Sequence, residues 1–94
     1  MNEQELKQSL ERERDALRQA RDELKLQLHL GSMEAKRQWD QLEKTWEQVS
    51  VEIERLGAHA KAPLDEIGKA TRSLLTEIKS GYERVREQLK SGNA

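Results

Sequence analysis

The 94-residue chain has no cysteine and no phenylalanine, only one proline and five glycines, and just two tryptophans and one tyrosine as aromatic residues. Without cysteine it can form no disulfide framework and carry out no thiolate chemistry. Leu, Ile and Val together supply 19 residues, about a fifth of the chain, so we do not expect a large core around an enclosed catalytic pocket.

An excess of charge of one sign is also missing. The chain has 17 basic and 18 acidic residues, a net charge of −1, and its three thirds are almost equally balanced. This balance disfavours a general nucleic-acid-binding role. No run of residues reaches the length of an apolar membrane span, and the N-terminus lacks the apolar core of a signal peptide, so we expect a cytoplasmic protein.

What the chain does contain is typical of long helices. Thirteen of the 19 aliphatic residues are leucine, and Ala, Glu, Lys, Arg and Gln make up most of the rest. The strongest break is the segment from Gly57 to Pro63, where glycine suits a helix end and proline the first turn of the next helix. We therefore predict an all-α single domain over 1–94, with a helix over about 3–56, a loop over 57–62 and a helix over about 63–90.

The apolar residues of the first segment share one helical face from Leu6 to Leu56, at about 100° per residue. Gly31-Ser32 looks like a helix end followed by an N-cap, but the apolar stripe keeps its phase across it, which favours a continuous helix. The prediction is thus a long antiparallel helical hairpin that self-associates as a coiled coil or helical bundle. The alternative is a three-helix bundle with a break at Gly31-Ser32.

A helix over 3–56 would be roughly 80 Å long, and the shorter second helix could cover only its second half. The uncovered strip, together with a second apolar face on the opposite side, is the predicted oligomer or partner interface. Its members are Leu6, Leu10, Leu17, Leu24, Leu28, Leu26, Leu30 and Met33. The predicted hairpin core comprises Trp39, Leu42, Trp46, Val49, Ile53, Leu56, Ile67, Leu74, Ile78 and Tyr82.

Motifs that carry chemistry are not found. His29 and His59 lack acidic or histidine neighbours at the helical spacing of metal ligands, and the serines have no nucleophile-elbow context. We therefore predict no catalytic, cofactor or metal site, and no enzyme activity. Trp39 and Trp46 are expected in the core, with a docking platform for a partner or lipid as the alternative.

One stretch resembles a known family. The string Glu-Leu-Lys-Leu-Gln-Leu-His-Leu-Gly over 23–31, with Glu34-Ala35-Lys36, Trp39, Leu42-Glu43-Lys44 and Trp46 after it, is similar to short bacterial coiled-coil proteins labelled as a stress-response family. The resemblance covers residues 15–56 well and 64–89 more loosely. It implies a small cytosolic helical protein made under stress, and it supplies no catalytic or ligand residues.

The leading functional hypothesis is a homo-oligomeric structural or protein-interaction protein. The alternative is peripheral membrane or lipid binding, with a long amphipathic helix lying on the lipid surface. The partners expected are a second copy and another protein, with no nucleic acid and with a membrane as the less favoured partner.

Overall fold

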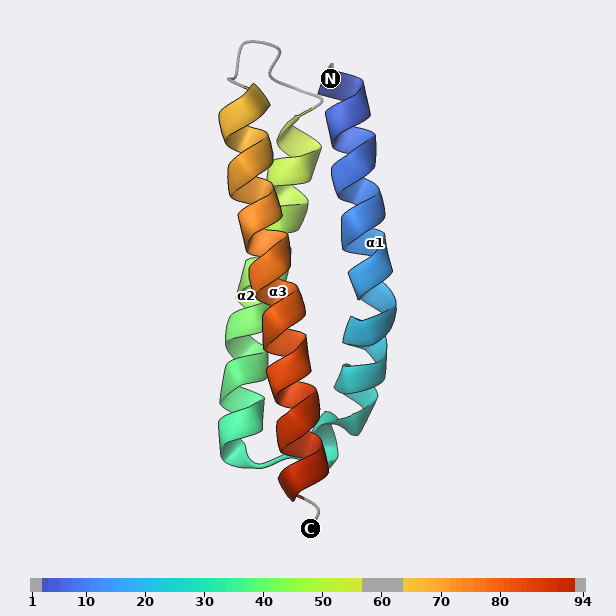
Figure 1. Ribbon diagram of the computed structural model, residues 1–94. Coiled ribbons are helices and arrows are strands. Elements are labelled where there is room, and N and C mark those ends of the chain that lie inside the picture. Colours follow the sequence, from blue (N-terminus) through green and yellow to red (C-terminus); the bar gives the residue numbers. More distant parts are fainter. Residues whose placement is uncertain (1–2, 57–63, 93–94) are drawn as a thin grey trace.

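The computed structural model describes residues 3–56 and 64–92, and nearly all of them are helical. The elements are α1 (Glu3–Gln27), a 3₁₀ turn η1 (Leu28–Leu30), α2 (Met33–Arg55) and α3 (Leu64–Gly92) (Figure 1). No strand occurs in these two described ranges. The predicted all-α fold is confirmed, in the form of the three-helix alternative.

The prediction of one continuous helix over 3–56 is wrong, because the chain turns at Gly31-Ser32. Gly31 has extended backbone angles (φ −85°, ψ 161°), and Ser32 is the N-cap of α2, with its Oγ accepting a hydrogen bond from the Ala35 N–H at 3.2 Å. The Gly31 N–H donates to the Leu28 carbonyl at 2.9 Å, which closes η1. Local hydrogen bonds therefore satisfy backbone groups at the end of η1 and at the start of α2. The periodicity of the apolar residues gives no information about these hydrogen bonds.

The turn makes α1 and α2 antiparallel neighbours, and α3 then runs in the same direction as α1 (Figure 1). The bundle measures 51 × 18 × 16 Å, so its length is that of one helix. One end carries η1, the start of α2 and the last turns of α3, and the other end carries the chain's N-terminal side (Figure 1). The predicted loop over 57–62, which includes Gly57 and His59, lies outside the described residues, and so does Pro63 after it.

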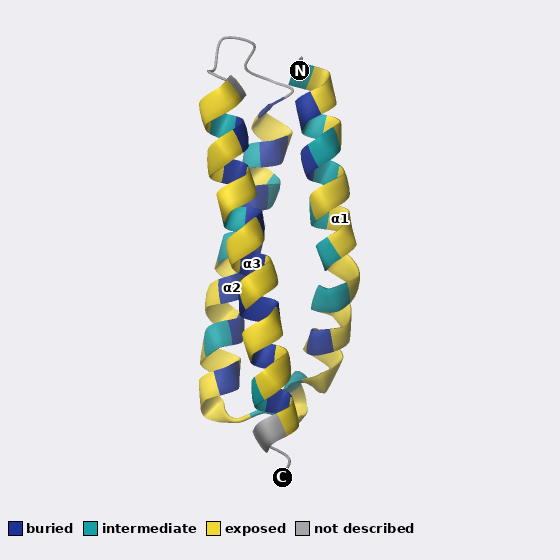
Figure 2. Cartoon of the chain, in the orientation of Figure 1, coloured by how far each residue is buried: buried dark blue, intermediate teal, exposed yellow. Residues whose placement is uncertain are grey.

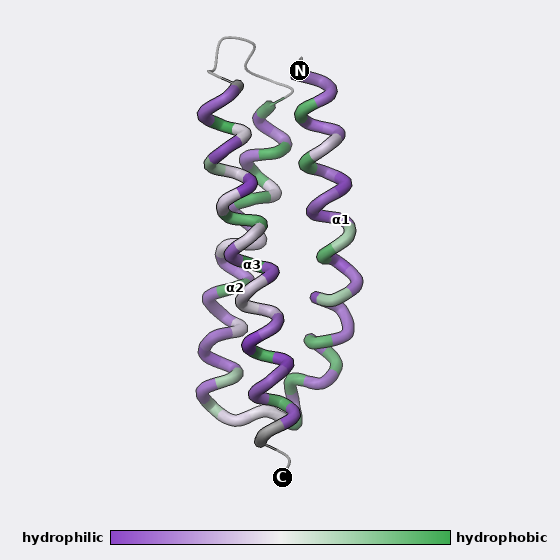
Figure 3. The backbone as a smooth tube through the Cα atoms, in the orientation of Figure 1, coloured by the Kyte–Doolittle hydropathy of each residue, from purple (hydrophilic) through white to green (hydrophobic). Residues whose placement is uncertain are grey.

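The core is a single cluster to which all three helices contribute. Leu10, Val49, Ile78 and Val85 are completely buried, and Thr71 is the one polar residue among the most deeply buried side chains of the described ranges. Buried residues face inward on every helix, and the apolar segments follow the same inner faces (Figures 2 and 3). A second copy is thus not needed to cover the apolar stripe.

Two glycines allow close helix contacts. A Cβ at Gly31 would lie 2.9 Å from Leu89 Cδ2, so α3 packs directly on the α1–α2 turn. A Cβ at Gly81 would overlap the side chain of Leu42, which fills the space between α2 and α3. Both positions favour glycine because of the neighbouring helix, since no described glycine has a positive φ.

Candidate functional site

The residues predicted to form an exposed interface divide into two groups in the structure. Leu6, Leu10 and Leu24 are buried, and Leu17 and Leu28 are partly buried and pack against the same core. The expectation that this strip faces water is wrong, because the break at Gly31-Ser32 folds α1 onto α3. The remaining three, Leu26, Leu30 and Met33, are exposed.

The residues predicted for the hairpin core lie where the helices meet. Trp39, Leu42, Trp46, Val49, Ile53, Leu56, Ile78 and Tyr82 are buried, and Ile67 and Leu74 are partly buried against them. Trp39 and Tyr82 stack with ring centroids 5.6 Å apart and an interplanar angle of 23°. Both tryptophan rings are therefore part of the packing, with Trp39 4% and Trp46 9% exposed.

An ion pair joins α1 to α2 beside these aromatic residues. Arg21 donates two hydrogen bonds to the Glu43 carboxylate, Nε to Oε1 at 2.8 Å and Nη2 to Oε2 at 2.7 Å. The Arg21 guanidinium carbon also lies 5.2 Å from the ring centroid of Trp46. This forked geometry, with a cation–π contact, fixes the approach of α1 to α2.

The Tyr82 hydroxyl lies close to this ion pair but finds no hydrogen-bond partner among the described residues. Burial raises the pKa of Tyr82 well above its ordinary value, and the negative charges of Glu43 and Asp22 add to the rise while Arg21 opposes it. A phenol that holds its proton this firmly has no role as a general base at neutral pH. The cluster is better explained as a structural tie than as a catalytic site.

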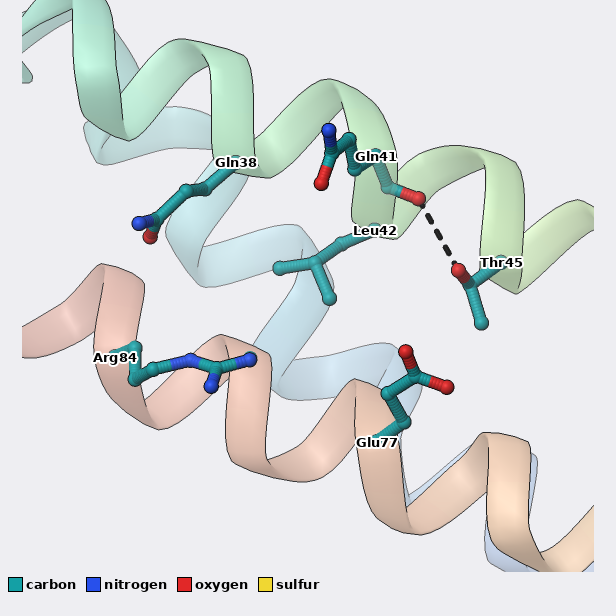
Figure 4. Close-up of a pocket in the computed structure, with 7 residues that line it drawn as sticks. Gln38, Gln41, Leu42, Thr45, Glu77 and Arg84 are labelled. Atoms are coloured by element: carbon teal, nitrogen blue, oxygen red, sulfur yellow. Dashed lines mark hydrogen bonds between the residues drawn. The ribbon is translucent and has the colours of Figure 1, made fainter.

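A shallow hollow of about 270 Å³ opens between α2 and α3, above Leu42 and beside Gly81. Gln38, Gln41 and Thr45 line one side, and Glu77 and Arg84 come from α3 on the other (Figure 4). The Thr45 hydroxyl donates to the Gln41 carbonyl at 3.2 Å. No nucleophile and base converge here, so the hollow offers no catalytic arrangement among the described residues.

The most unusual surface is the end of the bundle at the α1–α2 turn. Leu26 is 77% exposed, Leu30 57% and Met33 74%, and Val51, elsewhere on α2, is the only other exposed large hydrophobic residue of the described chain, at 43%. We call Leu26, Leu30 and Met33 the apolar tip. Beside it, a small hollow of about 220 Å³ is lined by Gln27, Leu30, Arg86, Leu89 and Lys90.

The end of the bundle that carries the apolar tip is rich in basic residues. Residues 25–37 and 84–90, which form this end, contain six basic and two acidic side chains, a net charge of +4 with His29 neutral. Arg37 pairs with Glu34 at 3.5 Å. The other five form no ion pair within the described part of the chain: Lys25, Lys36, Arg84, Arg86 and Lys90. At the other end, residues 3–9, 50–56 and 64–69 contain six acidic and three basic side chains, a net charge of −3. The bundle therefore has one basic end, which carries the apolar tip, and one acidic end.

His29 also lies at the tip. Its Nδ1 is 2.7 Å from the carbonyl oxygen of Leu26, and because a carbonyl only accepts, the ring donates this hydrogen bond. The contact satisfies a carbonyl in the last turn of α1, which is a structural role. In residues 3–56 and 64–92, no group of three or more His, Cys, Asp or Glu side chains is placed to hold a metal ion.

Hydropathy along the described helices gives a further result: none is both long and apolar enough to span a lipid bilayer. Comparison of the chain with models of known protein families, with curated proteins and with solved structures gives no match. The resemblance to a stress-response coiled-coil family therefore stays an expectation.

The basic end is not evident from the sequence. Arg86 and Lys90 are on α3 and Lys25 and Lys36 are on α1 and α2, so their proximity depends on the chain reversing at Gly31-Ser32 and again between α2 and α3. One sequence pattern does indicate unpaired basic side chains at this end. Arg72, Lys79 and Arg86 recur every seven residues on α3. Arg72 contacts Glu13 at 3.5 Å on α1, and residues seven and fourteen positions later on α1 are Ala20 and Gln27. In this parallel register, α1 supplies no carboxylate for Lys79 or Arg86.

Proposed function

We propose that the chain is a non-enzymatic interaction protein, a small helical bundle that docks through its apolar tip. The observation that carries this proposal is the exposure of Leu26, Leu30 and Met33 together at one end of an otherwise well-covered bundle. Exposed apolar groups gathered at one place are typical of binding surfaces, whereas isolated ones are ordinary. The absence of converging catalytic groups in the described residues agrees with a binding role. A cytoplasmic location and a role under stress, the latter implied by the resemblance alone, belong to the same proposal.

Self-association is the second candidate. An exposed strip on the first helix does not support it, since most of that strip packs inside one chain. What favours it is the apolar tip itself, which two copies could share. Like charge opposes a tip-to-tip pair, because each tip brings a net charge of +4 into the contact.

A photo-cross-linking amino acid at position 26 tests the docking role. The label replaces Leu26, and a matched label replaces Val51, which is also apolar and exposed but lies away from the tip. The proteins are irradiated in cells that naturally express the chain, and the adducts are analysed by mass spectrometry. We expect adducts from position 26 and few from position 51.

The mass of the adduct identifies the acceptor: lipid, another protein or a second copy. Any of these three supports an interaction protein that docks by its tip. Equal labelling from both positions, or none from position 26, would contradict the proposal.

A further inference from the structure

We propose that the acceptor of the apolar tip is an anionic lipid surface, into which Leu26, Leu30 and Met33 insert while the surrounding basic side chains contact the headgroups. This inference rests on the docking role proposed above and names its partner. It differs from a long amphipathic helix lying along the lipid, because here only one end of the bundle touches the membrane.

The shape of the tip favours lipid over a folded partner. The three apolar residues belong to the segment from the end of α1 to the first residue of α2, at the end of the elongated bundle where the chain reverses and where α3 also ends (Figure 1). A folded protein partner would need a surface shaped to match this end, whereas the interfacial region of a bilayer accommodates exposed apolar side chains without one. Apolar side chains of peripheral proteins reach roughly 5–10 Å into this region.

The charge around the tip favours an anionic surface. Helical spacing places Lys36 and Arg37 three and four residues after Met33, on the same side of α2. Arg86 and Lys90 line the hollow next to Leu30. Glu34 and Glu87 are the two carboxylates of this end, and Glu34 contacts Arg37 at 3.5 Å. The excess of positive charge, including five basic side chains without an ion pair in the described chain, complements anionic headgroups.

Vesicle flotation of the intact chain tests the proposal. One set of vesicles is phosphatidylcholine alone, and in the other part of the phosphatidylcholine is replaced by phosphatidylserine. We expect the protein to float with the anionic vesicles much more than with the neutral ones, and added salt to weaken this binding because screening reduces the attraction.

Two variants separate the apolar and the basic contributions. Leu26→Ser with Met33→Ser removes exposed apolar side chains, and we expect the partition coefficient on anionic vesicles to fall by more than about tenfold. Arg86→Gln with Lys90→Gln removes two positive charges, and we expect a loss of about fivefold per charge. All four residues are exposed, so the helical circular dichroism spectrum should not change.

Matched controls lie away from the tip. Val51→Ser removes an exposed apolar side chain elsewhere on α2, and Lys69→Gln removes an exposed positive charge near the opposite end. Both should bind anionic vesicles like the parent chain. Equal loss in the controls and the tip variants would overturn the proposal, as would a parent chain that does not float with anionic vesicles.

The two proposals fail separately. A parent chain that does not float, but whose label at position 26 cross-links to a protein or to a second copy, contradicts the lipid surface and leaves the docking role standing. A chain whose label at position 26 forms no adduct contradicts the docking role itself.

Discussion

Tyr82 is the residue with the clearest imbalance between packing and hydrogen bonding. Its ring stacks on Trp39, yet its hydroxyl is buried with no partner among the described residues. A buried hydroxyl without a hydrogen bond destabilises the folded state. Replacing tyrosine by phenylalanine removes this hydroxyl and keeps the packing contacts of the ring. We predict that Tyr82→Phe raises the free energy of unfolding by about 1 kcal/mol, measured by urea denaturation at neutral pH. A loss of stability would show that the hydroxyl has a partner.

The same hydroxyl makes the bundle sensitive to alkaline pH. Its pKa is raised in the folded state, mainly by burial, so above the unfolded value of about 10 the unfolded chain releases the proton first. The free energy of unfolding is therefore unaffected by the ionisation of Tyr82 below about pH 10, and this ionisation lowers it as the pH rises further. We expect the parent chain to lose stability above pH 10 more steeply than Tyr82→Phe, and two parallel curves would contradict this.

Arg21 holds α1 against α2 through its forked contact with Glu43. Its side chain is only 21% exposed, so the pair is less screened than a surface pair. We predict that Arg21→Gln lowers the free energy of unfolding by about 1–2 kcal/mol, because both the ion pair and the contact with Trp46 are lost. Arg18→Gln is the matched control, since Arg18 is 54% exposed and pairs with Asp15 on the same helix, and it should change stability by less than about 0.5 kcal/mol.

At the scale of the helices, Ser32 decides where α2 begins. Its side chain accepts the Ala35 N–H, so replacing it leaves one N-terminal amide of α2 without its cap. We predict that Ser32→Ala lowers the free energy of unfolding by about 1 kcal/mol. Ser73→Ala, at an exposed position within α3, is the control and should be neutral or slightly stabilising. Equal effects from both changes would refute the capping role.

Gly81 and Gly68 provide a matched pair on α3. Alanine in place of glycine stabilises a helix by up to about 1 kcal/mol. Overpacking in a core typically lowers the free energy of unfolding by about 1–3 kcal/mol. At Gly81 the new methyl would overlap Leu42, whereas at Gly68 its nearest neighbour is a terminal methyl of Leu6 at 3.2 Å. We predict that Gly81→Ala is destabilising and Gly68→Ala neutral to stabilising by thermal denaturation. The reverse order would contradict the close approach of α2 to α3 at Gly81.

The helices themselves could be predicted from the sequence, because the apolar residues recur at helical spacing and only a few glycines interrupt them. The apolar periodicity does not predict the break at Gly31-Ser32, and the reason is physical. Three helices that share one core each turn their apolar stripe inward. The stripes of two helices joined by a short turn can therefore have the same helical phase as the stripe of one continuous helix. The local signal, a glycine followed by a capping serine, indicated the turn correctly.

At the scale of the whole molecule, the uneven charge could not be predicted from segments of the sequence. Each third of the chain is nearly neutral, yet the folded bundle has a basic end of net +4 and an acidic end of net −3. Helices α1, α2 and α3 lie side by side along the bundle, so each end collects residues from several segments of the chain (Figure 1). The same folding places Leu30 beside Arg86 and Lys90, which is why the apolar tip and its basic surroundings come together only in three dimensions.

In the structure described above, α1 closes onto α3 within one chain. Small-angle X-ray scattering on an absolute scale tests it, because one curve gives both the particle mass and its dimensions. We predict a mass near 10.9 kDa and a radius of gyration close to the 15.0 Å of the Cα trace, slightly increased by hydration. A particle of twice that mass and roughly 80 Å in length, the length of a continuous helix over 3–56, would contradict the closed bundle.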